Sequence, residues 1–123
     1  MFQNDHDAVP IETGTSKLLA HSQAGVGWIV FNQPEKRNAL SVEMQRAIPE
    51  VLSRFAFDTD TRVVVLRGAG NEAFASGADI SEFEQQRSSA NARAEFDQAW
   101  AATTLAFEQF EKPVIAVIYG VCF

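Results

Sequence analysis

The sequence predicts an α/β fold, and three observations support this prediction. Two continuous apolar runs, Val63–Leu66 and Val114–Tyr119, are typical of strands buried on both faces of a parallel sheet. Segments with a helical apolar period lie before the first run and between the two. The resulting order is strand, strand, helix, strand, helix, helix, strand, which implies right-handed crossovers. The 123 residues amount to one domain or part of one.

The first 32 residues predict a leader followed by a hairpin. Residues 1–16 are polar and mixed, and we expect them to form a flexible leader without chemistry. Residues 17–32 hold two short apolar stretches, separated by the turn signal Gln23-Ala24-Gly25. This pattern is typical of a β-hairpin.

A helix is predicted to begin after Ser41, which is a good N-cap. Glu43 lies in its first turn, where the helix dipole favours negative charge. Apolar residues recur at helical spacing, and they are Met44, Ile48, Val51, Leu52 and Phe55. Pro49 removes one backbone donor, so we expect the helix to be kinked or split there. The sequence offers no feature that compensates for Pro49.

Three short pieces follow the strand at residues 63–66. We expect a turn at Gly68–Asn71, an extended segment at Phe74–Ala75 and a polar helical stretch that begins near Asp79 or Ile80. These pieces place a stretch of small residues between a buried strand and a helix.

A longer helix is predicted over about Asn91–Glu111. Its expected core face consists of Phe96, Trp100, Thr103, Phe107 and Phe110. The second apolar run follows, and the sequence ends shortly after it at Phe123. Because a parallel strand normally needs cover on both faces, we expect the chain either to be a fragment or to borrow cover from another chain.

Composition excludes several classes of function. A net charge of −6 without a basic cluster argues against nucleic-acid binding, although it leaves room for an anionic small molecule. Cys122 is the single cysteine, and His6 and His21 are not at metal-ligand spacing, so we expect no disulfide within the chain and no metal. The sequence has no signal-peptide pattern and no membrane-spanning run, so we expect a cytoplasmic protein that does not interact with membranes.

Two segments are candidates for chemistry. Phe74–Ile80 joins a strand to a helix, where small residues and unpaired N–H groups are able to hold an oxyanion; the alternative is a tight turn with Asp79 as a helix cap. Pro34–Ser41 carries Lys36 and Arg37, which either contact a ligand phosphate or are simply solvated.

Together these segments resemble the enoyl-CoA hydratase/isomerase (crotonase) superfamily. The resemblance runs from about Gly25 to Phe123, and its four blocks are Asn32–Ser41, Asp60–Gly68, Phe74–Ile80 and Lys112–Gly120. It implies a crotonase-like fold, the ClpP/crotonase-type ββα spiral, incomplete at the C-terminus. Residues 17–123 would then be the N-terminal part of an acyl-CoA-binding domain.

The resemblance also implies roles for individual residues. The partner would be an acyl-CoA thioester, with coenzyme A as part of the substrate and no separate cofactor. Ala78 would give the first backbone donor to the thioester oxygen, stabilising an enolate. The thioester and pantetheine path would be lined by Ser76, Gly77, Asp79 and Ile80. The rest of CoA would be contacted by Lys36, Arg37, Asn38 and Ala39.

In the family, a glycine-rich turn after Tyr119-Gly120 gives the second donor, and the catalytic glutamates and the trimer-building helices follow. We therefore expect the 123-residue chain to be inactive alone and to lack the usual trimer or hexamer interface. Three residues depart from the family pattern: Gln33 replaces a common arginine, Tyr119 an asparagine, and Ser81 a lysine of several hydratases.

The sequence thus favours an acyl-CoA hydratase or isomerase and leaves the acyl group and the reaction subtype open. One alternative is a non-catalytic CoA-binding or assembly module, such as a truncated remnant. The other is an α/β domain that only looks like this family.

Overall fold

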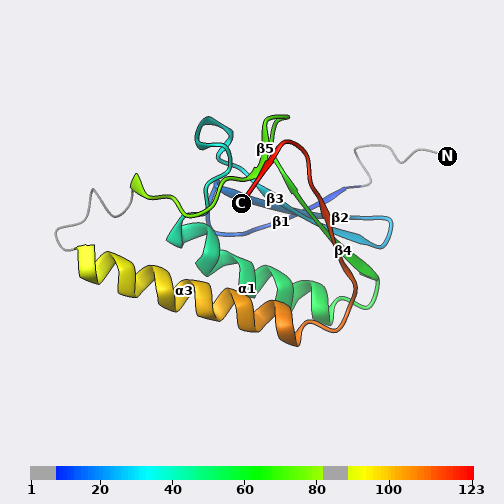
Figure 1. The fold of residues 1–123 in the computed structure, drawn as a ribbon. Coiled ribbons are helices and arrows are strands. Elements are labelled where there is room, and N and C mark those ends of the chain that lie inside the picture. Colours follow the sequence, from blue (N-terminus) through cyan, green and yellow to red (C-terminus); the bar gives the residue numbers. More distant parts are fainter. Residues whose placement is uncertain (1–7, 82–88) are drawn as a thin grey trace.

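The computed structural model describes residues 8–81 and 89–123. A five-stranded sheet lies over two helices stacked below it (Figure 1). In spatial order its strands are β1 (Val9–Ile11), β2 (Leu18–Gln23), β3 (Val26–Phe31), β4 (Val63–Gly68) and β6 (Val114–Val117). A second, two-stranded sheet pairs β5 (Ala73–Ala75) with β7 (Val121–Cys122). The helices given by the described residues are a 3₁₀ turn, η2 (Pro34–Lys36), α1 (Val42–Phe57) and α3 (Ser89–Gln109). The predicted α/β class is confirmed.

The N-terminal strand β1 corrects part of the predicted leader. Val9 pairs with Ser22 and Ile11 with Ala20, in antiparallel register with β2. Pro10 fits there because β1 is an edge strand, which tolerates a missing donor. Three residues are too few to give a readable alternating pattern, so the sequence did not reveal this strand. Residues 1–7 of the predicted leader lie outside the described residues.

The predicted hairpin is confirmed. β2 and β3 pair antiparallel from Leu18↔Phe31 to Gln23↔Val26. The two residues between them, Ala24 and Gly25, both have positive φ, at 53° and 83°. This backbone matches the turns that join twisted strands in two residues.

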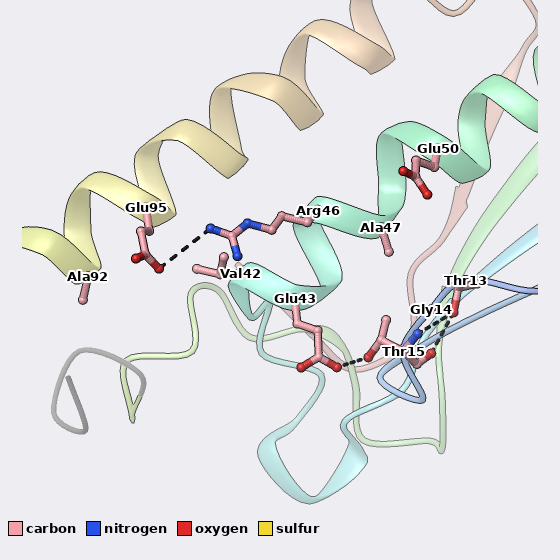
Figure 2. Close-up of a pocket in the computed structure, with 10 residues that line it drawn as sticks. All are labelled: Thr13, Gly14, Thr15, Val42, Glu43, Arg46, Ala47, Glu50, Ala92 and Glu95. Carbon is pink, nitrogen blue, oxygen red and sulfur yellow. Dashed lines mark hydrogen bonds and ion pairs between the residues drawn. The ribbon is translucent and has the colours of Figure 1, made fainter.

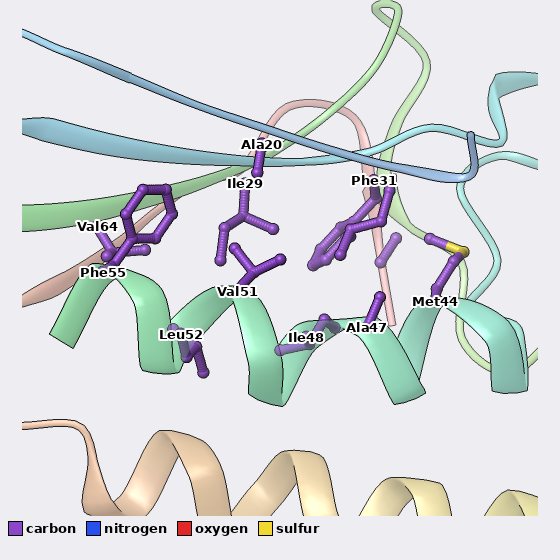
Figure 3. Packing of buried hydrophobic residues seen from close by; sticks show 12 residues of the cluster. Ala20, Ile29, Phe31, Met44, Ala47, Ile48, Val51, Leu52, Phe55 and Val64 are labelled. Carbon is purple, nitrogen blue, oxygen red and sulfur yellow. The ribbon is translucent and has the colours of Figure 1, made fainter. Parts of the chain in front are cut away.

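Helix α1 and the sheet form the core (Figure 3). The Ser41 hydroxyl accepts the Met44 N–H at 3.1 Å, which confirms the predicted N-cap. The predicted apolar stripe is confirmed, since Met44, Ile48, Val51, Leu52 and Phe55 are each at most 2% exposed. They form one cluster with Leu18, Ile29, Phe31 and Val64 of the sheet. Val51 and Phe55 point toward the sheet, and Leu52 points toward α3 (Figure 3).

Helix α1 passes through Pro49 without being split. A proline at position 49 cannot donate to the carbonyl of Gln45, four residues earlier. The Thr103 hydroxyl of α3 donates to that carbonyl instead, at 2.8 Å. A side chain from the neighbouring helix therefore replaces the hydrogen bond that Pro49 removes.

Helix α3 confirms the predicted element but only part of its predicted core face. Thr103 is 7% exposed, whereas Trp100 is 50% exposed and stacks on Phe96 at a ring-centroid distance of 6.4 Å. The face packed on α1 includes the small buried residues Ala92 and Ala99. α3 packs on α1 along one side, and the aromatic stripe of α3 extends beyond that contact, so it is not wholly enclosed.

Strand β6 was predicted to be buried on both faces, and this is wrong for the described residues. It pairs in parallel with β4, as expected, from Val64↔Val114 to Arg67↔Val117. All four of its residues are exposed, Ile115 by 52%. β6 is the outermost strand of the sheet, and the described elements leave its two faces without a covering layer. The predicted helical stretch after Asp79 lies mostly in residues 82–88, outside the described residues.

Candidate functional site

The two segments predicted to carry chemistry lie side by side. Leu40 and Ala78 form a parallel bridge, in which the Leu40 N–H donates to the Gly77 carbonyl at 2.7 Å. The Asp79 N–H donates to the Leu40 carbonyl at 3.0 Å. The Ser76 hydroxyl adds a third link, to the Lys36 carbonyl at 3.0 Å. These bonds join segments that are about 40 residues apart in the chain.

Asn38 fixes the first segment to the residues that lead into the second. Its φ is 56°, a left-handed conformation that asparagine tolerates. Its side-chain NH₂ donates to the carbonyls of Ala69 and Ala73, at 3.0 and 2.8 Å. Its side-chain oxygen accepts the Gln33 N–H at 2.9 Å. Gly68 leaves room for this, since a side chain there would collide with the Asn38 amide and the Ala73 carbonyl.

The backbone N–H of Ala78 stands out in this arrangement. In a parallel pairing the bridged residue is bonded through its two neighbours, so the Ala78 N–H points away from Leu40. Within the part of the chain that the structure describes, this N–H donates no hydrogen bond. The Gly77–Ala78 peptide, which carries this N–H, is fixed through its carbonyl, and the next peptide is fixed through the Asp79 N–H. Among the described residues the Ala78 N–H is therefore held in place but has no acceptor.

Asp79 is the centre of a polar cluster next to that N–H. The residue is 3% exposed, and its carboxylate accepts from the Lys36 ammonium at 3.2 Å and the Ser81 hydroxyl at 2.6 Å. The Ser81 N–H and the Gln33 amide also donate to it, at 3.2 and 3.4 Å. Burial alone would raise the pKa of Asp79, but the hydrogen bonds and the Lys36 charge outweigh it and lower the pKa below its ordinary value.

A cavity of about 440 Å³ opens at this cluster, and it is lined by Lys36, Ala39, Ser76, Ala78, Asp79, Ile80 and Ser81. A second groove, of about 730 Å³, lies between residues 34–38 and 69–76. Arg37 lines it, with a side chain that is 67% exposed and a guanidinium nitrogen 3.9 Å from the Glu72 carboxylate. Lys36 and Ser76 line both spaces, so the two adjoin each other.

The structure therefore brings most of the predicted site residues together. Lys36, Ala39, Ser76, Ala78, Asp79 and Ile80 share the smaller cavity, and Arg37 and Asn38 line the groove beside it. Gly77 lies between them, with φ at 101°. Their roles toward a ligand stay predictions.

Two further residues were not predicted to belong to the site. Gln33 and Ser81 both donate to Asp79. Each stands where the sequence departs from the family pattern, and that departure was the available signal. It did not say which group each residue would meet.

A separate pocket of about 490 Å³ lies between residues 13–15, α1 and α3 (Figure 2). An ion pair between Arg46 and Glu95, at 3.8 Å, spans from α1 to α3 beside it. Glu43 accepts a hydrogen bond from the Thr15 hydroxyl on its other side. None of the predicted site residues lines this pocket. Among the described residues no group of His, Cys, Asp or Glu is arranged to hold a metal ion.

Comparison with known proteins decides the family. A sequence model of the enoyl-CoA hydratase/isomerase family matches residues 21–123. This chain belongs to the enoyl-CoA hydratase/isomerase family. The rat mitochondrial 3-hydroxyisobutyryl-CoA hydrolase is 30% identical over 111 residues, covering 89% of this chain and 29% of the relative. The Arabidopsis thaliana peroxisomal Δ(3,5)-Δ(2,4)-dienoyl-CoA isomerase is 34% identical over 115 residues, covering 85% and 41%.

The fold comparison agrees with this assignment. A crystal structure of an enoyl-CoA hydratase/carnithine racemase from Magnetospirillum magneticum matches with a TM-score of 0.78 and 30% identity. The match covers 95% of this chain and 42% of that one. The crotonase-like fold of this family member is thus confirmed, and the chain spans between 29% and 42% of the length of these three proteins. No helix among its described residues is long and apolar enough to cross a membrane.

Proposed function

We propose that this chain forms the thioester-binding part of an acyl-CoA hydratase or isomerase, with the Ala78 N–H as an oxyanion donor. The available Ala78 N–H at the cavity is the observation that carries the proposal. The peptide that carries this N–H and the peptide after it are both bonded to Leu40, so the donor is held in place before a ligand arrives. A fixed donor aimed at developing negative charge contributes roughly 3–4 kcal/mol in the oxyanion hole of another enzyme class.

The rest of the ligand would extend along the two adjoining spaces. Ser76, Gly77 and Ile80 would line the thioester and pantetheine path, since they flank Ala78 and Ile80 is 67% exposed. Arg37 would face the CoA phosphates from the larger groove, because its guanidinium is exposed and only loosely paired. Coenzyme A would be part of the substrate, and we propose no separate cofactor.

Asn38 and Ala39 would act through the shape of the loop. They are 1% and 7% exposed, and the Asn38 amide is occupied by backbone carbonyls. Their contribution to CoA binding would come from the conformation they impose on residues 36–37. This refines the predicted direct contact for both residues.

The reaction subtype is a separate question. The similar proteins are named as a hydrolase, an isomerase and a hydratase/racemase, so stabilisation of a thioester oxyanion is the chemistry we propose for this chain. Ser81, which holds Asp79, stands where several hydratases have lysine. The serine at position 81 therefore does not support a classical hydratase over the other reaction subtypes.

We also propose that these 123 residues do not turn over a substrate alone. Among the described residues that line the Ala78 cavity, Asp79 is the only carboxylate, and its oxygens are occupied by Lys36 and Ser81. A general base has to reach its proton directly. Strand β7 leads to Phe123 beside Gly77, so a glycine-rich turn after it, as in the family, would bring the second donor close to Ala78.

Paired ligands test the binding proposal. Butyryl-CoA carries the thioester carbonyl, and S-butyl-CoA, its thioether analogue, lacks it. In ¹⁵N-labelled protein we expect the Ala78 amide signal to shift with butyryl-CoA and not with the thioether. The Arg37 amide signal should shift with both. An Ala78 signal that responds equally to the two ligands would contradict the oxyanion role.

Crotonyl-CoA tests the second part. We expect the concentration of crotonyl-CoA to stay unchanged in the presence of the isolated chain, while butyryl-CoA still binds. This is the behaviour of a CoA-binding module. Measurable hydration would overturn the proposed inactivity and leave the binding proposal in place.

A further inference from the structure

The buried carboxylate of Asp79 requires a counter-charge. Its side chain is 4% exposed, and an isolated carboxylate at such a position is strongly unfavourable. Gln33 donates a hydrogen bond but carries no charge. Among residues 8–81 and 89–123, the ion pairs give Asp79 a single cationic partner, the Lys36 ammonium at 3.2 Å.

Lys36 is bound twice in this cluster. Its ammonium also donates to the Ser81 hydroxyl at 3.0 Å, and Ser81 in turn donates to Asp79. The stem of Lys36 comes from the η2 turn, and Asp79 and Ser81 come from the segment after β5. The cluster therefore connects the two walls of the Ala78 cavity by charge, beside the backbone bonds that connect them at Leu40.

We infer that Asp79 and Lys36 are a positioning pair, which fixes the direction of the Ala78 N–H. The Lys36 ammonium accordingly pairs with Asp79 and does not bind a phosphate of the ligand. The inference rests on the proposed function of Ala78. Asp79 is adjacent to Ala78, and its own N–H forms one of the two bonds that hold the Ala78 segment to Leu40. The Ala78 N–H itself belongs to the Gly77–Ala78 peptide, whose carbonyl accepts the other bond, from the Leu40 N–H. Releasing the carboxylate would loosen the Asp79 bond and leave the Gly77–Ala78 peptide held to Leu40 by one bond, about which it could turn.

Binding of butyryl-CoA and of S-butyl-CoA to variants of Lys36 and Asp79 distinguishes the positioning role from phosphate binding. The variants are Lys36→Met, which keeps the stem and removes the charge, and Asp79→Asn, which keeps the shape and removes the carboxylate. We expect each to lower the affinity for butyryl-CoA by about three- to tenfold, the range of one well-placed hydrogen bond, with little change for S-butyl-CoA. Lys36→Arg keeps the charge and should restore the preference for the thioester.

Arg37→Met is the matched control, because Arg37 is the neighbouring cation on the same loop and is paired only loosely. It should weaken butyryl-CoA and S-butyl-CoA alike. If Lys36→Met behaves like this control, Lys36 binds phosphate and the inference is overturned.

Amide hydrogen exchange tests the pair without any ligand. We expect the Asp79 and Leu40 amides to exchange faster in Lys36→Met and in Asp79→Asn, and at the wild-type rate in Arg37→Met. Unchanged rates in the first two variants would overturn the inference even where butyryl-CoA binds. An Ala78 amide that ignores butyryl-CoA in the wild-type protein would instead overturn the proposed function itself.

Discussion

Helices α1 and α3 lie next to each other, yet they differ sharply in how well they are covered. α1 has the sheet on one side and α3 on the other, and its core stripe is at most 2% exposed (Figures 1 and 3). α3 has α1 on one side, and Trp100 and Leu105 are each about half exposed. Strand β6, which follows α3, is exposed along its whole length. Apolar sequence alone does not bury a residue; a layer on each side does.

This difference predicts where the stability of the described chain lies. Burial removes apolar area from water in proportion to what covers it, so the layer that contains α1 should contribute most. Substitutions of the same chemistry at covered and uncovered positions measure that directly.

The largest expected effect is at Phe55. Phe55→Ala should lower the free energy of unfolding by about 3–5 kcal/mol, because the ring is fully buried and fills the space over Gly27. Phe57→Ala, two residues along and 85% exposed, should change it by less than about 0.5 kcal/mol. Urea unfolding of both variants is the measurement. Equal losses would mean that Phe57 is covered in solution.

The hydrogen bond between the two helices should have the next largest effect. Thr103→Val leaves the Gln45 carbonyl without its donor, and we expect a loss of about 1–3 kcal/mol. Pro49→Ala supplies a backbone N–H for the same carbonyl. In the Pro49→Ala background, Thr103→Val should therefore cost less, and a double-mutant cycle by urea unfolding would give the difference. Additive effects would show that Thr103 does not substitute for the missing N–H.

The free energy of unfolding should depend on acid pH through Asp79 at the site. The pKa of Asp79 is lowered in the folded state, so its ion pair stabilises the fold above the ordinary carboxyl pKa of about 3.9. That contribution is lost as pH falls through the lower folded value. Asp79→Asn should thus show a shallower loss of stability in acid than the wild-type protein, measured by urea unfolding at several pH values. Parallel curves for the two proteins would contradict the lowered pKa.

Local signals in the sequence predicted most of α1 and the hairpin. Ser41 caps its own helix, and the Gln23-Ala24-Gly25 turn joins adjacent strands, so each signal and its consequence lie within a few residues. The exposure of Trp100 and Ile115 could not be predicted this way, because it depends on which elements pack above them.

The same distinction applies to the site. The small residues around Ala78 marked the segment as a candidate, and the family resemblance added the role. The Lys36 and Gln33 partners of Asp79 could not be predicted, since they are 43 and 46 residues away in the chain. The link that replaces the Pro49 hydrogen bond spans 58 residues. Contacts over such separations follow from the folded topology and leave no local pattern.

The smallest expected effect is on β6. Ile115→Thr should change the free energy of unfolding by no more than about 0.5 kcal/mol, because Ile115 is already 52% exposed and threonine also favours strands. Ile29→Thr is the matched control in β3, where the side chain is fully buried and the same change should cost several times more. If urea unfolding gives both variants the same loss, β6 is covered in solution. Repeating the measurement at several protein concentrations then tells whether a second copy provides the cover, since only association makes stability depend on concentration.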